Sequence, residues 1–150
     1  MSEIEEIFKS ARARARELGL PYEGALLPVE AQTILQKLPN AKLVDVRSRA
    51  ELAFVGRVPG SIEIEWKSYP SMLPNPKFLE QLKQQVPADA VVMFLCRSGG
   101  RSHDTAVAAT QAGYRDAFNV LEGFEGERDA GGHRNTVGGW RARGLPWTQS

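Results

Sequence analysis

One short segment of this sequence has residue types and spacing that could carry chemistry. Cys96 is the only cysteine in the chain, and the segment Arg97-Ser98-Gly99-Gly100-Arg101-Ser102 follows it directly. Adjacent glycines allow backbone angles that other residues avoid, so this segment can curl with its N–H groups pointing inward as an anion-binding nest. The inward donors and the two arginines favour a thiolate over a neutral thiol. We therefore predict that Cys96 is a nucleophile in an anion cradle formed by residues 97–102.

The alternative is that Cys96 is a buried structural residue, because a lone cysteine often serves only as a small apolar side chain. Packing alone does not call for a polar, glycine-rich segment directly after the cysteine, so we favour the nucleophile. His103 could act as a base, but a thiolate needs none, and we expect His103 to lie on the surface of a helix. We expect His133, in a glycine-rich region, to be solvated.

The elements that must position this segment alternate between strand-like and helix-like patterns. Short apolar runs lie at residues 25–27, 42–46, 62–64, 90–95 and 118–120. Amphipathic runs lie at residues 29–38, 48–54, 75–86 and 102–112. This alternation is typical of a single α/β domain whose mainly parallel central sheet has helices on both faces.

The run at residues 90–95 has no polar alternation, so we expect it to be the central strand, buried on both sides. Cys96 follows it at the carboxyl edge of the sheet, where open α/β sheets bind ligands. The strand and the segment after it therefore predict the same site.

Before these elements, residues 1–24 are predicted to form a helical extension. Ser2 can cap a helix whose apolar residues recur at three- and four-residue spacing, and Gly19 and Pro21 can end it. The remaining residues, 25–150, are assigned to the main domain.

Composition narrows the possible partners. The 150-residue chain has 19 Lys and Arg against 18 Asp and Glu, a formal net charge of +1, so we expect neither nucleic acid nor a membrane surface as a partner. The apolar run at residues 90–96 is much shorter than the roughly 20 residues that span a bilayer. The acidic start of the chain does not fit a secretory signal, which favours a cytoplasmic location. A single cysteine excludes an internal disulfide and a zinc site built mainly from thiolates, so we expect no metal or other cofactor.

Several motifs, in order along the chain, resemble those of the single-domain rhodanese family. Residues 43–47, with Glu51 and then residues 56–61, resemble its amino-terminal signature, and residues 118–124 and 144–147 resemble its later ones. The resemblance spans residues 26–147 and implies a rhodanese-like fold. Arg57 departs from the family's usual His, and Glu127 from its common aromatic residue. The sequence leaves open whether the long glycine-rich segment, residues 128–139, forms a lid over the cysteine or a surface loop.

The family resemblance implies a rhodanese-type thiosulfate sulfurtransferase with Cys96 as the catalytic residue that carries sulfur as a persulfide. Arg97, Ser98, Gly99, Gly100, Arg101 and Ser102 would bind a small anionic sulfur donor, with the two arginines attracting its sulfonate. Asp45 and Arg47 would orient the loop from a supporting layer, with Glu51 pairing with Arg47. The sulfur acceptor would be an external thiol, cyanide or a protein.

Two other functions use the same kind of thiolate. A cysteine-dependent phosphatase or arsenate reductase resembles Cys-x5-Arg, but here Arg101 comes one position early and Ser102 stands in the expected place. The smaller ring suits a single sulfur atom better than a phosphate. A persulfide carrier dedicated to one protein partner would have the same loop, and the sequence does not exclude it.

Overall fold

The computed structural model describes residues 2–149 and has a five-stranded, wholly parallel sheet at its centre. In spatial order the strands are β1 (Gly24–Leu26), β7 (Ala117–Val120), β6 (Val91–Leu95), β2 (Ala41–Asp45) and β3 (Ile62–Glu63). The helices are α1 (Glu3–Leu18), α2 (Pro28–Lys37), α3 (Arg49–Phe54), α4 (Phe78–Gln85) and α5 (Gly100–Gln111). The predicted α/β class is confirmed.

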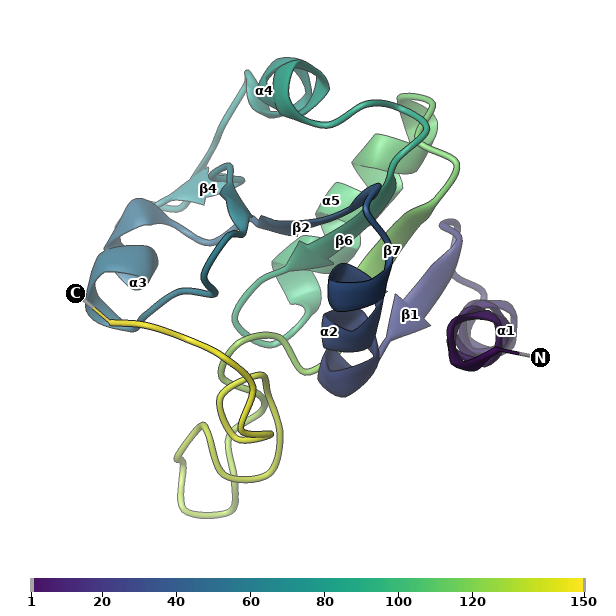
Figure 1. Ribbon diagram of the computed structural model, residues 1–150. Coiled ribbons are helices and arrows are strands. Elements are labelled where there is room, and N and C mark those ends of the chain that lie inside the picture. The colour runs from purple at the N-terminus through teal and green to yellow at the C-terminus, as the bar shows by residue number, and fades with distance from the viewer. Residues whose placement is uncertain (1, 150) are drawn as a thin grey trace.

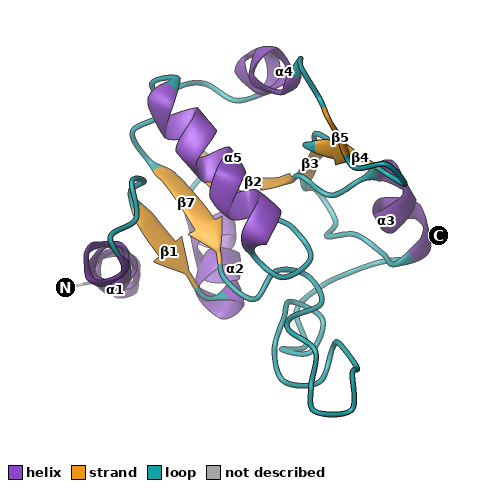
Figure 2. Cartoon of the chain, turned by 180° about the vertical axis from the view of Figure 1, so that it is seen from behind, coloured by secondary structure: helices purple, strands orange, loops and turns teal. Residues whose placement is uncertain are grey.

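Helices cover both faces of the sheet, as Figures 1 and 2 show from opposite sides. The alternation along β6 explains the two cores, because successive side chains of a strand point to opposite faces. Val92 and Phe94 pack into the core that α4 and α5 cover. Met93 and Leu95 pack into the core that α1 and α2 cover. Every residue of β6 is buried, and the strand is the middle one of five, as its sequence predicted.

The first helix begins and ends at the predicted signals. The Ser2 side chain accepts a hydrogen bond from the Glu5 N–H, and Gly19 ends the helix in the left-handed conformation. The helix packs through Ala11 and Ala15, both buried, and the Phe8 ring lies 5.4 Å from that of Phe118 in β7. The extension therefore covers the edge of the sheet where β1 pairs with β7.

Between β3 and α4 the structure contains an antiparallel pair that sequence patterns did not predict. The strands β4 (Lys67–Ser68) and β5 (Leu73–Pro74) have two residues each, too few to show a period. The following helix starts at Phe78, later than expected, because Pro76 and the Asn75 side chain, which accepts from the Lys77 N–H at 3.0 Å, form a turn first. No helix within residues 2–149 has the length and apolarity needed to cross a membrane.

Candidate active site

Cys96 lies directly beyond the end of β6 and is 1% exposed. The Gly99 N–H donates to its sulfur at 3.1 Å, and the Ser102 hydroxyl oxygen lies 3.3 Å from the same atom. Gly99 has a φ of 111°, a backbone angle that residues other than glycine rarely adopt, so the turn depends on this glycine. The sulfur thus sits at the junction of the central strand and the next helix, as predicted.

That helix, α5, directs the positive end of its dipole toward the turn. A helix leaves the N–H groups of its first turn without intrahelical acceptors. Among residues 2–149, no side chain caps this end, where Gly99 is the N-cap residue. The free N–H groups and the dipole make this turn suited to negative charge.

The turn at residues 121–126 supports the cysteine loop through backbone hydrogen bonds. The Phe124 N–H donates to the Cys96 carbonyl at 2.8 Å, and the Glu125 N–H donates to the Arg97 carbonyl at 2.9 Å. Gly123 has a φ of 65°, and a Cβ there would lie 2.5 Å from the Arg97 carbonyl group. The Glu-Gly-Phe motif is therefore a backbone support that only glycine permits at its centre.

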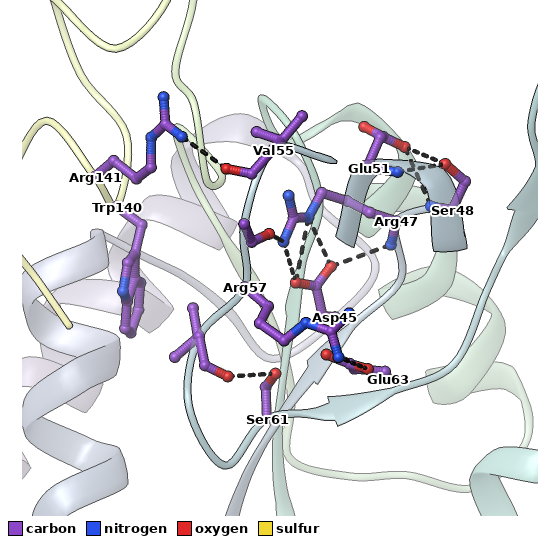
Figure 3. Close-up of polar contacts among 12 residues, drawn as sticks. Asp45, Arg47, Ser48, Glu51, Val55, Arg57, Ser61, Glu63, Trp140 and Arg141 are labelled. Atoms are coloured by element: carbon purple, nitrogen blue, oxygen red, sulfur yellow. Dashed lines mark hydrogen bonds and ion pairs between the residues drawn. The ribbon is translucent and has the colours of Figure 1, made fainter. Parts of the chain in front are cut away.

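Asp45 and Arg47 form a fully buried ion pair, shown in Figure 3. Arg47 donates to the Asp45 carboxylate through Nε at 3.0 Å and through Nη2 at 2.7 Å, and also to the Gly56 carbonyl at 2.8 Å. Its guanidinium lies 4.2 Å from the centre of the Phe124 ring. The pair thus supports the cysteine loop indirectly, because Arg47 packs on Phe124 and Phe124 bonds to the Cys96 carbonyl.

Glu51 does not pair with Arg47, so that expectation was wrong. It accepts a bidentate hydrogen bond from Arg101, at 2.7 and 2.8 Å, and it also accepts from Ser48 at the start of α3. Burial alone would raise the pKa of Glu51, but the Arg101 guanidinium and Ser48 outweigh it and lower the pKa from 4.5 to about 2. Arg47 is already committed to the nearer Asp45, which leaves Glu51 to the loop arginine.

Arg97 contrasts with Arg101. Its side chain is exposed and makes no hydrogen bond or ion pair with any residue from 2 to 149. The loop therefore carries one neutralised arginine and one whose charge is free to meet an anion.

Two residues that sequence patterns did not assign to the site contact the cradle. Asn119, in the middle of β7, bonds both to Ser102 and to Gly99. Tyr22, just before β1, bonds to His103 at 2.7 Å, so His103 is half-buried and paired rather than lying freely on the helix surface. A polar residue in the otherwise apolar run at residues 117–120 was the available signal for Asn119. The side chain of His133 is 80% exposed, as expected.

The glycine-rich segment folds back on the supporting turn. The Asn135 N–H donates to the Glu125 carbonyl at 2.7 Å, and Arg134 donates to the Gly126 carbonyl at 2.7 Å. The glycine-rich segment thus contacts the same turn that donates backbone hydrogen bonds to the Arg97 carbonyl.

A separate cleft of about 990 Å³ lies beside α3 and the β4–β5 pair. Arg49, Arg57 and Gln81 are among its lining residues, and residues 96–102 are not. Within residues 2–149, no three His, Cys, Asp or Glu side chains gather in an arrangement that could hold a metal ion.

Several known proteins are similar to this chain. Residues 28–129 match the family model described as Rhodanese-like domain. The chain is 35% identical over 124 residues to an uncharacterized protein of Rickettsia conorii, covering 79% of this chain and 91% of that one. It superposes on the crystal structure of Rv0390 from M. tuberculosis with a TM-score of 0.79 and 44% identity, covering 86% and 99% of the two chains. It is also 25% identical over 121 residues to a sulfurtransferase of Allochromatium vinosum, covering 79% and 91%.

Proposed function

The chain belongs to the rhodanese-like domain family, and from this premise we propose that it is a sulfurtransferase that carries sulfur on Cys96. The donor is a small anion with a sulfane sulfur, such as thiosulfate, and the acceptor is cyanide or a thiol, free or on a protein. The similarity to a sulfurtransferase supports the reaction class. The observation that carries the proposal is the Cys96 sulfur beside the Gly99 N–H and the uncapped start of α5.

In the first half-reaction the Cys96 thiolate attacks the outer sulfur of thiosulfate. A new S–S bond forms to Cys96, the original S–S bond breaks, and its electron pair leaves with sulfite. The persulfide that remains carries its negative charge on the outer sulfur. The free N–H groups of the first turn of α5 stabilise that charge.

In the second half-reaction the nucleophile of the acceptor attacks the outer sulfur of the persulfide. The bond to Cys96 breaks and its electron pair returns to the Cys96 sulfur, so the thiolate is regenerated. Cyanide leaves as thiocyanate and a thiolate leaves as a persulfide. Arg97 draws the anionic donor to the loop through its unpaired charge.

Arg101 weighs against phosphate or arsenate chemistry. In such enzymes the loop arginine clamps the oxyanion, whereas here both terminal nitrogens of Arg101 donate to Glu51. The arginine also stands at the fifth position after the cysteine, not the sixth. Sulfur transfer uses the cradle as it stands.

The test is the intact mass of the protein after incubation with thiosulfate. We expect a gain of one sulfur atom, lost again on addition of cyanide with release of thiocyanate. The variant Cys96→Ser should neither gain mass nor turn over, because a hydroxyl lacks the nucleophilicity of a thiolate. Turnover retained by that variant would show that the nucleophile is misassigned. Loading from a persulfidated protein but not from thiosulfate would instead identify a dedicated carrier.

A further inference from the structure

Within residues 2–149, the two polar groups in hydrogen-bond contact with the Cys96 sulfur are held by a single side chain. Asn119 is 3% exposed in the middle of β7. Its Oδ1 accepts a hydrogen bond from the Ser102 hydroxyl at 2.5 Å, and its Nδ2 donates to the Gly99 carbonyl at 3.2 Å. Ser102 and Gly99 are the residues whose Oγ and N–H face the sulfur. The amide of Asn119 thus bridges the two sides of the sulfur contact.

The orientation of this amide is determined by its partners. The Gly99 carbonyl can only accept, so the nitrogen of Asn119 must face it and the oxygen must face Ser102. The second N–H of Asn119 points to the Tyr22 hydroxyl, 3.5 Å away, which in turn bonds to His103 in the first turn of α5. Every polar group of the Asn119 side chain therefore has a partner that fits it.

We propose that Asn119 is a positioning residue for sulfur transfer: it aims the Gly99 N–H at the Cys96 sulfur and, by accepting the Ser102 proton, holds the Ser102 oxygen beside that sulfur, with Tyr22 anchoring its amide. The inference rests on the proposed function and adds the residues that shape its site. Tyr22 lies outside residues 28–129, the part that matches the family model. The segment before β1 is thereby assigned a part in the active site.

The neutrality of the Asn119 side chain matters as much as its hydrogen bonds. An aspartate has nearly the same shape, but an ionised carboxylate would face the Gly99 carbonyl oxygen and place negative charge close to the thiolate or persulfide. Like charges disfavour each other's ionised forms, and burial strengthens the effect. If Asn119 only filled space, Asn119→Asp would be the mild change and Asn119→Ala, which leaves a cavity, the severe one.

The experiment measures alkylation of the protein by iodoacetamide across pH, together with kcat and KM for thiosulfate. Since Cys96 is the only cysteine, alkylation reports on that thiol alone. We expect Asn119→Asp to shift the midpoint of alkylation upward by about one pH unit or more. We expect Asn119→Ala to lower kcat about tenfold, with KM changed less than about twofold, because Asn119 does not touch the donor.

Two buried tyrosines provide a matched pair of variants. Tyr22→Phe removes the hydroxyl that anchors Asn119 and should lower kcat by about threefold. Tyr114→Phe removes the hydroxyl of another buried tyrosine, which donates to the Val86 carbonyl at 2.6 Å at the far end of α5, and should leave kcat unchanged. Urea unfolding of each variant verifies that it is folded under the assay conditions.

The outcomes separate this inference from the proposed function. An unchanged alkylation midpoint in folded Asn119→Asp, or an unchanged kcat in Asn119→Ala, would overturn the inference while sulfur transfer by the wild type stands. Should Asn119→Asp not fold, the kcat and KM values of Asn119→Ala and Tyr22→Phe decide the matter. If no chain transfers sulfur yet the alkylation midpoint shifts, the proposed reaction fails and the positioning of Cys96 by Asn119 stands.

Discussion

The cysteine loop contains Arg97 and Arg101, and Arg47 lies against Phe124 in the turn that supports it; the three differ in what their charge is free to do. Arg47 is neutralised by Asp45 and is fully buried, and Arg101 is neutralised by Glu51. Only Arg97, among the loop's residues, presents an exposed guanidinium without a protein partner in residues 2–149. At the scale of single residues, attraction of an anionic donor therefore falls to Arg97.

We predict that Arg97→Ala raises KM for thiosulfate about tenfold and changes kcat little, because a charge-assisted contact contributes roughly 1.5–3 kcal/mol before solvent screening reduces it. Steady-state kinetics at low and high salt would measure this, and the salt dependence of KM should weaken in the variant. Arg115→Ala is the matched control, since Arg115 is exposed next to the amino-terminal end of β7, at the opposite edge of the sheet. Equal effects of the two substitutions would mean that net charge, and not Arg97, attracts the donor.

At the scale of elements, the site consists of two loops that share backbone hydrogen bonds. The cysteine loop leaves β6 and the supporting turn leaves β7, and neighbouring parallel strands bring both to one edge of the sheet. Their close approach at Gly123 is the point where added volume would separate them.

We predict that Gly123→Ala abolishes most of the activity and destabilises the fold by about 2–4 kcal/mol, from a strained φ plus overpacking against the Arg97 backbone. Gly19→Ala is the matched control: its φ is 66° against 65° for Gly123, but a Cβ there meets nothing within 4 Å. It should cost only the conformational part, about 1–2 kcal/mol, and leave kcat unchanged. Urea unfolding and kcat for both variants would measure the difference, and similar losses for the two would refute the contact at Gly123.

At the scale of the whole molecule, the Glu51–Arg101 pair joins helices that lie on either side of the central strand in sequence. The two residues are 50 positions apart, and their side chains are about 15% exposed. The pair connects α3, which follows β2, to the first turn of α5, so loop geometry and global stability depend on a common contact.

The pair predicts a pH dependence of stability. Glu51 has its pKa lowered from 4.5 to about 2 in the folded chain, so its contribution is full above pH 4.5 and is lost as the pH falls toward 2. The loss amounts to about 2–3 kcal/mol. Glu51→Gln should be less stable at pH 7 and should lose less stability than the wild type between pH 5 and about 2.5. Urea unfolding at several pH values checks this, and parallel curves for the two chains would contradict it.

Features that depend on neighbouring residues could be predicted from the sequence alone. The run at residues 90–95 predicted the central strand, because a strand that is buried on both faces must be apolar throughout. Ser2 and Gly19 predicted the ends of α1, because capping acts within one turn of the helix. The placement of Cys96 after that strand, with the glycines and arginines that follow it, was likewise evident from adjacent residues.

The side chains that meet around the sulfur from distant parts of the chain could be identified only from the folded structure. Glu51 was expected to pair with Arg47, but the Asp45–Arg47 pair, two residues apart, left it to Arg101. Asn119 meets Ser102 across 17 residues and Tyr22 across 97. Such pairings depend on strand order and on the packing of helices against the sheet, which bring together residues that no local spacing relates.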